Sequence, residues 1–518
     1  MNVSEAVLHE LVGLGVEACF GNPGTSEMHL VASFDRVGGL RPILGLFEGV
    51  CTGAADGYAR MAGKPAATLL HLGPGLGNGF ANTHNAKRGQ SRMINLVGDH
   101  ATYHRKYDAP LQSDIHSIAK PISDWIGDPV SGPDAVAKTR QAFDVAMRPN
   151  GGLSTLIVPA DIAWSEMTAG PKSAPWKRPP AKPVDMAAVR EAAAALRSSE
   201  PRMLLIGGHA GLERPLALAA AIAEKTGAKL FADTFVPRLA RGRGRARPDR
   251  VPYLGEMAVM MMQGYRQAVM VGTKAPVAFF AYPGKPSTFL SPECKTYQPW
   301  DTENDVMDVL TALAEEVGAK VGPIADGGST PEVPSSGPLN VQTFGDAFAA
   351  LLPEGAIVSD EAITSGTWAQ IASQNSAPHD WLALTGGAIG DGIPMAVGAA
   401  VACPNRPVIN IQADGSSMYT FQGLWTAARE NLHVITILFN NKSYGILNME
   451  LDRVGATAQS ERSRSLLSLD KPVIDFTALG RAMGASAVRV EDAAGFVNAF
   501  KRALAEKGRP HLIEAIMA

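Results

Sequence analysis

Short apolar runs that alternate with alanine-rich stretches of helical period constrain the fold of this chain most strongly. The runs lie at 66–72, 93–99, 154–160, 202–208, 267–273, 407–415 and 434–441, and many of them end in Gly or Asp. Continuous apolar strands separated by helices are typical of parallel sheets that are covered on both faces. The sequence therefore predicts doubly wound α/β domains, in which ligands bind beyond the carboxyl ends of the strands.

Two segments rich in proline and glycine divide the chain into three parts of similar length. Residues 168–184 and 322–338 have a composition that disfavours both helix and sheet, so we expect them to be linkers. With 518 residues, the chain also exceeds the size of a single hydrophobic core. We therefore predict three doubly wound parallel-sheet domains, at 1–167, 185–321 and 339–518.

The composition argues against several classes of protein. The chain is 46% hydrophobic and 19% charged, as in globular proteins, and its net charge of −3 gives no indication of nucleic-acid binding. No apolar run reaches the ~18–20 residues of a membrane helix, and residues 1–20 resemble an amphipathic helix rather than a signal peptide. Four scattered cysteines without a Cys-x-x-Cys pair favour a reduced, cytoplasmic setting. The arginine cluster at 238–250 contains glycines and a proline, and we expect it to be a solvated loop rather than an anion site.

The third part contains a candidate anion and metal site. An apolar strand ends at Asp414, and the next strand ends just before Asn441, which lies 27 positions later. Neighbouring parallel strands end at the same edge of a sheet, so these two side chains are expected to meet. With a backbone carbonyl near Ser443 they form an oxygen-only set suited to Mg²⁺ or Ca²⁺. Backbone N–H groups at Gly415 and Ser416 could then bind a phosphate, although each motif alone is more often a plain turn or loop.

Glu48 is unusual because it directly follows the apolar run 42–47 and opens a segment of small residues that is expected to be helical. A buried carboxylate is costly unless it has a partner. Taken alone, this stretch favours a salt bridge from Glu48 to Arg60 or Lys64. The alternative is a carboxylate that is reserved for a ligand.

Taken together, the two stretches resemble the thiamine-diphosphate-dependent enzymes, with Ala413-Asp414-Gly415 where that family usually has Gly-Asp-Gly. The resemblance implies a pyrimidine-binding first domain, a middle domain and a diphosphate-binding third domain. It assigns Glu48 to activation of the cofactor, through a hydrogen bond to a ring nitrogen of the aminopyrimidine. It assigns Asp414, Asn441 and Ser443 to the metal ion, either Mg²⁺ or Ca²⁺.

The resemblance implies further cofactor contacts and an oligomer. In the segment 385–400, the carbonyl of Gly387 would accept a hydrogen bond from the aminopyrimidine and Ile389 would wedge the cofactor into its bent shape. The remaining cofactor contacts are assigned to Asn78, Gly415, Ser416, Tyr444 and Gly445. In this family the two cofactor-binding domains of one site come from different subunits. A homodimer at least is implied, and a homotetramer is usual, with Glu48 and Asp414 meeting across the interface.

Two more stretches resemble benzoylformate decarboxylase and its relatives: 20–27, with the sequence FGNPGTSE, and 70–78, with the sequence LHLGPGLGN. The resemblance implies that His71 assists proton transfer on the substrate and that Thr25 contacts the substrate carboxylate. A lone histidine is more often structural, and we expect the histidines of the following polar loop to be structural or superficial. These are His100, His104 and His116.

The middle part departs from both of the nearest subgroups. The stretch 275–287 contains Phe279, Phe280 and Tyr282 but lacks the second active-site histidine of benzoylformate decarboxylase. Acetolactate synthases usually bind FAD in this domain, but the chain shows no clear dinucleotide fingerprint there, so FAD is not expected. Apolar residues in this stretch and near Ile446 hint at an uncharged substrate tail, but the sequence does not name the substrate.

The resemblance therefore implies an enzyme that decarboxylates a 2-oxo acid with thiamine diphosphate and Mg²⁺, through a ylide and an enamine. The nearest alternative is a carboligase of the acetolactate synthase type, which joins the enamine to a second carbonyl. A nicotinamide-dependent oxidoreductase is disfavoured, because no strand is followed by a clean Gly-x-Gly-x-x-Gly with an acidic residue ~20 positions later. A catalytically silent relative that only binds the cofactor is a remote alternative.

Overall fold

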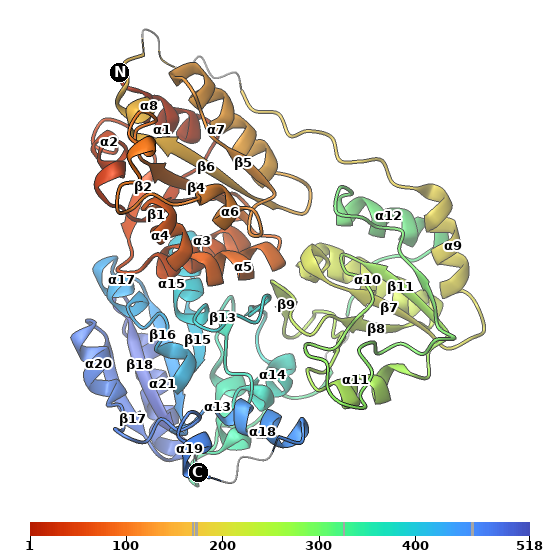
Figure 1. The fold of residues 1–518 in the computed structure, drawn as a ribbon. Helices are drawn as coiled ribbons and strands as arrows, with labels where there is room; N and C mark the ends of the chain where they lie inside the picture. Colours follow the sequence, from red (N-terminus) through yellow and green to blue (C-terminus); the bar gives the residue numbers. More distant parts are fainter. Residues whose placement is uncertain (168–169, 171–174, 325–326, 457–459, 518) are drawn as a thin grey trace.

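The computed structural model describes residues 1–167, 170, 175–324, 327–456 and 460–517. Among these residues, the strands form three sheets in which the pairing is almost entirely parallel. Figure 1 shows the first sheet at the top, the second at the right and the third below. The predicted α/β class with three parallel sheets is thereby confirmed. Parts of both predicted linkers lie outside the described residues.

The first sheet has the order β2-β1-β3-β4-β6-β5. Its strands are β1 (Ala18–Asn22), β2 (Arg41–Leu44), β3 (Ala66–Leu70), β4 (Arg92–Asp99), β5 (Trp125–Gly127) and β6 (Gly152–Pro159). Its helices are α1 (Val3–Gly13), η1 (Thr25–Glu27), α2 (Met28–Ser33), α3 (Glu48–Ala62), α4 (Leu72–Asn78), α5 (Phe80–Arg88), η2 (Arg105–Tyr107), α6 (Ile115–Ala119), α7 (Gly132–Ala146) and α8 (Ala160–Trp164). Every residue of β3 and β6 is buried, which explains the continuous apolar runs in the sequence.

The second sheet has the order β10-β8-β7-β11-β12. Its strands are β7 (Arg202–Ile206), β8 (Lys229–Ala232), β10 (Asp249–Arg250), β11 (Gln267–Val271) and β12 (Lys295–Tyr297). Its helices are α9 (Met186–Leu196), η3 (Gly208–Gly211), α10 (Glu213–Thr226), α11 (Gly255–Met262) and α12 (Val306–Val317). These elements lie between Met186 and Val317.

The third sheet has the order β17-β18-β16-β15-β13-β14-β9. Its strands are β13 (Ile357–Asp360), β14 (His379–Ala383), β15 (Val408–Ala413), β16 (Val434–Asn440), β17 (Ser486–Val490), β18 (His511–Ile516) and the short β9 (Leu239–Arg241). Its helices are α13 (Val341–Leu351), α14 (Thr367–Ala372), η4 (Ser373–Asn375), α15 (Gly392–Ala402), α16 (Asp414–Ser417), α17 (Gly423–Arg429), α18 (Gly445–Arg453), α19 (Glu461–Arg464), α20 (Phe476–Ala482) and α21 (Ala493–Ala505).

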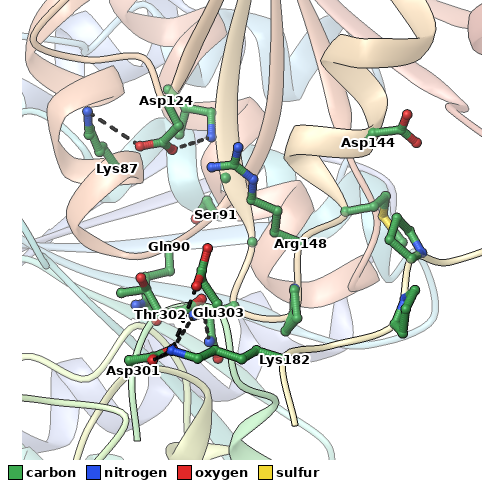
Figure 2. A pocket seen from close by; sticks show the side chains of 18 residues that line it. Lys87, Gln90, Ser91, Asp124, Asp144, Arg148, Lys182, Asp301, Thr302 and Glu303 are labelled. Atoms are coloured by element: carbon green, nitrogen blue, oxygen red, sulfur yellow. Dashed lines mark hydrogen bonds and ion pairs between the residues drawn. The ribbon is translucent and has the colours of Figure 1, made fainter.

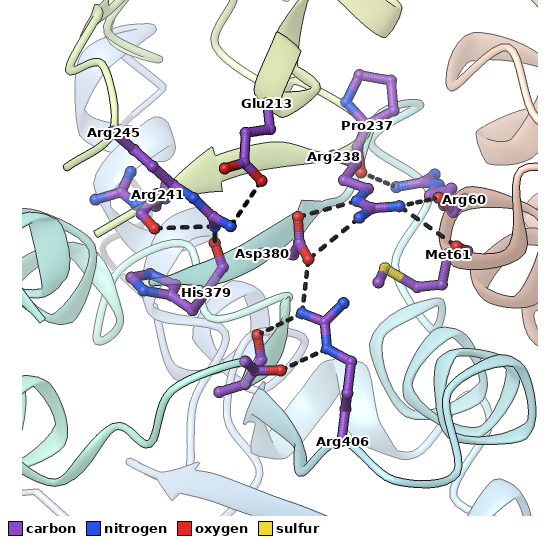
Figure 3. A network of polar contacts seen from close by, with 12 residues as sticks. Arg60, Met61, Glu213, Pro237, Arg238, Arg241, Arg245, His379, Asp380 and Arg406 are labelled. Carbon is purple, nitrogen blue, oxygen red and sulfur yellow. Dashed lines mark hydrogen bonds and ion pairs between the residues drawn. The ribbon is translucent and has the colours of Figure 1, made fainter. Parts of the chain in front are cut away.

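Strand β9 corrects the expectation that the arginine cluster is a solvated loop. Although it comes from the middle part of the chain, β9 pairs antiparallel with β14 at the edge of the third sheet. The guanidinium of Arg238 donates to both oxygens of Asp380 at 3.0 and 3.3 Å, as Figure 3 shows. Arg406 also donates to Asp380, at 2.6 Å, and Arg241 is only 8% exposed. Arg238 and Arg241, which come from the middle part of the chain, thus contact the third domain, and glycine-rich composition alone did not reveal Asp380 as the partner of Arg238.

The first and third domains share a hydrophobic core in which helices α3 and α15 pack against each other. Their backbones touch: a Cβ atom at Gly57 would lie 2.0 Å from the carbonyl oxygen of Met395, and one at Gly398 would lie 1.8 Å from that of Ala54. Only glycine permits this approach. The helix that begins at Glu48 is thus anchored on the third domain.

None of the helices among the described residues combines the length and the apolar composition that a bilayer crossing requires.

Candidate active site

A buried carboxylate and an imidazole form a hydrogen-bonded pair at the carboxyl edge of the first sheet. Glu27 is fully buried, and its carboxylate accepts hydrogen bonds from Gly24 N, Ser26 Oγ and His71 Nδ1, each at 2.8 Å. These donors balance the cost of burying the charge. Because Nδ1 of His71 donates to Glu27, the electron pair of the neutral ring lies on Nε2. Nε2 is therefore the atom that can take up a proton.

His71 and Thr25 were predicted from the sequence as site residues, but Glu27 was not. Glu27 and His71 are 44 residues apart, so no local pattern connects them. A capping-box pattern could have indicated Glu27, because an acidic side chain three positions after Gly24 can accept the backbone N–H of Gly24. A Cβ atom at Gly24 would lie 2.3 Å from Nδ1 of His71, so the loop that carries the exposed Thr25 presses on the imidazole.

Glu48 lies next to this group, at the first turn of α3. It is 9% exposed, and Nδ2 of Asn78 donates to its Oε2 at 3.0 Å. A Cβ atom at Gly75 would lie 3.1 Å from Oε1 of Glu48 and 3.3 Å from Cβ of His71. The structure therefore brings together Glu48, His71 and Asn78, which the sequence analysis had named separately.

The salt bridge that was the alternative for Glu48 does not form. Arg60 donates to both oxygens of Asp56 instead, at 2.8 and 2.6 Å. Lys64 pairs with Glu17. Among the described residues, the hydrogen bond recorded for the Glu48 carboxylate is the one from Asn78. Its Oε1 accepts no hydrogen bond from the described residues.

Asp414 and Asn441 meet where β15 and β16 end side by side. Oδ2 of Asp414 accepts the backbone N–H groups of Asn441 at 3.1 Å and Lys442 at 2.7 Å, while Oδ1 accepts that of Gly415 at 2.8 Å. Burial raises the pKa of Asp414, and these N–H groups oppose that rise. Oδ1 of Asn441 accepts the N–H of Ser443 at 2.9 Å. The predicted proximity of the two strand ends is present.

The turn after β15 is covered by the start of α18. The ring of Tyr444 lies against Gly415, where a Cβ atom would be 2.3 Å from the ring, and Gly445 is the first residue of α18. Ser416 is buried, and its hydroxyl donates to Oε1 of Gln412 at 2.5 Å. Within the described ranges there is no cluster of three His, Cys, Asp or Glu side chains that could hold a metal. A cation here would depend on one carboxylate together with amide and carbonyl oxygens.

The segment 385–392 crosses between the two domains and is held by α5. Asn85 bonds both the N–H of Ala388, at 3.1 Å, and its carbonyl, at 2.7 Å. Gly387 has a φ of +75° and is exposed, whereas Ile389 is half-buried. Cε1 of Phe279, from the middle domain, would lie 3.8 Å from a Cβ atom at Gly387. An aromatic side chain of the second domain thus borders this segment.

Of the histidines that were expected to lie outside the site, His100 and His104 lie in the loop after β4 and His116 lies in α6. The rings of His100 and His104 lie 5.5 Å apart, and the ring of His104 lies 5.7 Å from that of Tyr107. Nε2 of His116 lies 3.6 Å from a carboxylate oxygen of Asp128.

A cavity of about 830 Å³ lies elsewhere, between the first domain, the first linker and the middle domain (Figure 2). Its charges largely satisfy one another: Nζ of Lys87 lies 3.5 Å from Asp124, and Lys182 lies 2.5 Å from Asp301. None of the predicted site residues lines this cavity. Its size alone gives no reason to place the chemistry there.

Comparisons with known proteins match the two parts of the chain that contain Glu48 and Asp414. Residues 1–120 match the N-terminal TPP binding domain of thiamine pyrophosphate enzymes, and residues 364–515 match their C-terminal TPP binding domain. The chain is 47% identical to the "Putative acetolactate synthase large subunit IlvX" of Mycobacterium tuberculosis, over 100% of this chain and 99% of that protein. It is 29% identical to benzoylformate decarboxylase of Pseudomonas aeruginosa, over 96% of each chain. A thiamine diphosphate-dependent 4-hydroxybenzoylformate decarboxylase of Rhodococcus jostii has a similar structure, with a TM-score of 0.85, 25% identity and coverage of 100% and 99%.

Proposed function

The chain belongs to the thiamine-diphosphate-dependent enzymes, and from this premise we propose that it decarboxylates a 2-oxo acid with thiamine diphosphate and Mg²⁺. The observation that carries the proposal is the pair formed by the buried Glu27 and the partly exposed His71, which lies beside Glu48 across Gly75. An activating carboxylate and an oriented imidazole at one edge of the sheet suit a reaction that moves protons on a bound substrate.

The residues present fit the cofactor and its metal. Asp414, Asn441 and a backbone carbonyl near Ser443 supply oxygen atoms only, the donor type that Mg²⁺ prefers, with room for phosphate oxygens in its coordination shell. Gly387 is exposed and could offer its carbonyl, and Ile389 has the branched apolar side chain that a wedge requires. When bound, thiamine diphosphate supplies the electron sink for the bond that breaks as carbon dioxide leaves.

The protein would provide orientation and selective proton transfer. Glu48 would share a proton with a ring nitrogen of the cofactor, and Asn78 would keep that carboxylate in place. Nε2 of His71 would take up or deliver a proton at the substrate, because Glu27 holds the opposite side of the ring. The exposed hydroxyl of Thr25, on the loop that presses against His71, would bind the substrate carboxylate.

The acyl side chain of the substrate is proposed to be uncharged. Phe279 borders Gly387, and its ring packs against Phe235 at 5.4 Å and Tyr253 at 5.1 Å. Phe280 is 59% exposed in the same loop. Aromatic surface at the edge of a site favours an apolar ligand group over a charged one.

We also propose a homodimer at least, and a homotetramer as the complete assembly. The support is the family to which the chain belongs, in which the two cofactor-binding domains of one site come from different subunits. Glu48 of one copy would then face Asp414 of another.

A second candidate is a carboligase that transfers the decarboxylated unit to another carbonyl. It is favoured by the acetolactate synthase name of the Mycobacterium tuberculosis relative, which is 47% identical. The two candidates share the first half of the reaction and differ in whether the product is an aldehyde or a longer hydroxyketone.

The test is carbon dioxide release from a panel of 2-oxo acids, with and without thiamine diphosphate and Mg²⁺. Glu48→Gln should abolish release, whereas Glu461→Gln, at a carboxylate whose side chain is 89% exposed, should not. Product analysis then separates the aldehyde from the hydroxyketone. Cofactor binding without turnover of any acid would refute the proposal.

A further inference from the structure

Glu361 is a buried carboxylate that the roles described above leave without a function. It follows β13 directly and is only 3% exposed. Oε1 accepts the backbone N–H groups of Gly390 and Asp391, the latter at 3.4 Å. Oε2 accepts the N–H of Gly392 at 2.7 Å and Nε2 of Gln412 at 2.8 Å. All of these donors belong to two segments that adjoin the candidate cofactor site.

Gln412 extends this contact to the turn that begins at Asp414. Its Oε1 accepts the N–H of Ala413 at 2.9 Å and the hydroxyl of Ser416 at 2.5 Å. An unbroken chain of hydrogen bonds thus leads from Gly390 and Gly392 through Glu361 and Gln412 to Ser416. It connects the segment that would hold the aminopyrimidine with the turn that would hold the diphosphate.

We propose that Glu361 is a positioning residue that fixes these two segments relative to each other before the cofactor binds. The inference rests on the proposed function, because it takes both segments as parts of one cofactor site. Gly387 and Gly390 have φ values of +75° and +99°, and glycine loses more conformational freedom than any other residue when its backbone is ordered. A segment that is already ordered binds its ligand with a smaller loss of conformational entropy.

The carboxylate also suits the start of α15. Gly392 is the first residue of that helix, where N–H groups without helical partners point outward. A negative charge is favourable at this end. Glu361 therefore serves as an acceptor for the helix start and the preceding loop together, and a neutral amide would satisfy these donors less well because one of its two groups is itself a donor.

The experiment compares Glu361→Gln with Asp360→Asn in the full-length protein. Asp360 is the neighbouring carboxylate, but it accepts Trp381 Nε1 at 3.1 Å and Ala362 N at 3.0 Å, and so contacts neither segment. Calorimetry gives the dissociation constant of thiamine diphosphate in the presence of Mg²⁺. Thermal unfolding of the cofactor-free proteins reports on general stability, and amide hydrogen exchange at Gly390 and Gly392 reports on local order.

We expect Glu361→Gln to weaken cofactor binding by about 10–100-fold, as is typical when a residue that supports the direct contacts of a site is changed. The exchange of these two amides should accelerate. Asp360→Asn should leave the dissociation constant unchanged even if it lowers the unfolding temperature. The double variant Glu361→Gln with Gln412→Glu should recover part of the affinity, because it restores a carboxylate–amide pair at the same place.

Unchanged affinity in Glu361→Gln, or equal weakening in Asp360→Asn, would overturn the inference. If Glu361→Gln does not fold, Gln412→Leu tests the same chain of hydrogen bonds while keeping the carboxylate, and unchanged affinity in that variant would count against it equally. Failure of the wild-type protein to bind thiamine diphosphate would instead refute the proposed function, so the two failures are distinguishable.

Discussion

Replacing Glu27 by glutamine should slow turnover strongly while leaving the fold intact. The amide oxygen can still accept the N–H of Gly24, and the amide nitrogen can donate to Ser26, so the local hydrogen bonds can largely be rebuilt. The charge opposite His71 is lost. Two unit charges 2.8 Å apart interact by about 6 kcal/mol at an effective dielectric constant of 20. Because the imidazole is 22% exposed, solvent screens part of this energy.

We therefore expect about 2–4 kcal/mol less stabilisation of protonated His71, which corresponds to a decrease in kcat of about 30- to 1,000-fold. The assay is carbon dioxide release at saturating cofactor, with the dissociation constant of thiamine diphosphate measured in parallel. Glu10→Gln is the matched control, since Glu10 is a buried glutamate of the same domain that pairs with Arg140 at 2.8 Å. A kcat of Glu27→Gln within twofold of wild type would refute the reasoning, and so would a loss of cofactor binding in place of turnover.

Three further predictions concern packing, pH and the junction between domains. Gly75→Ala should lower kcat at least about 10-fold with little change in unfolding temperature, because the added methyl would stand 3.1 Å from Oε1 of Glu48. Burial raises the pKa of Asp233 to about 7, so the folded state holds this proton more tightly and the free energy of unfolding should fall as the pH rises from about 4 to about 7. Urea unfolding at pH 5 and pH 8 should show that Asp233→Asn removes about 3 kcal/mol of this loss; an equal pH dependence in both proteins would contradict it. Arg238→Ala should lower the free energy of unfolding in urea by about 1–3 kcal/mol, because Asp380 keeps its bond from Arg406 but loses both bonds from Arg238. An unchanged unfolding curve would show that this junction contributes little to stability.

The parallel sheets could be predicted because their strands are buried on both faces. A strand such as β6, in which every residue is buried, reads as one apolar run with a clear end. The same logic predicted that Asp414 and Asn441 would meet, and the register that pairs Ala413 with Phe439 brings them within hydrogen-bond reach. Both predictions depend only on the local pattern and on the geometry of parallel strands.

Contacts between distant segments could not be predicted in this way. Glu27 finds His71 across 44 residues, and Glu361 finds Gln412 across 51. Neither glutamate belongs to a periodic sequence pattern from which a buried hydrogen-bond partner could be predicted. The prediction of a solvated loop at 238–250 was wrong because a segment rich in glycine and arginine has the composition of a surface loop. The burial of Arg241 depends instead on β14, which lies far along the chain.

Helices α3 and α15 act as a mechanical linkage within one subunit. Their backbones are in contact at Gly57 and Gly398, so there is no layer of side chains that could deform between them. Glu48 stands at the beginning of one helix, and the segment up to Gly392 leads into the beginning of the other. A shift of one helix would therefore displace the other as well. Glu48 and the segment that ends at Gly392 are thus coupled in position within one subunit, whichever cofactor site each of them serves.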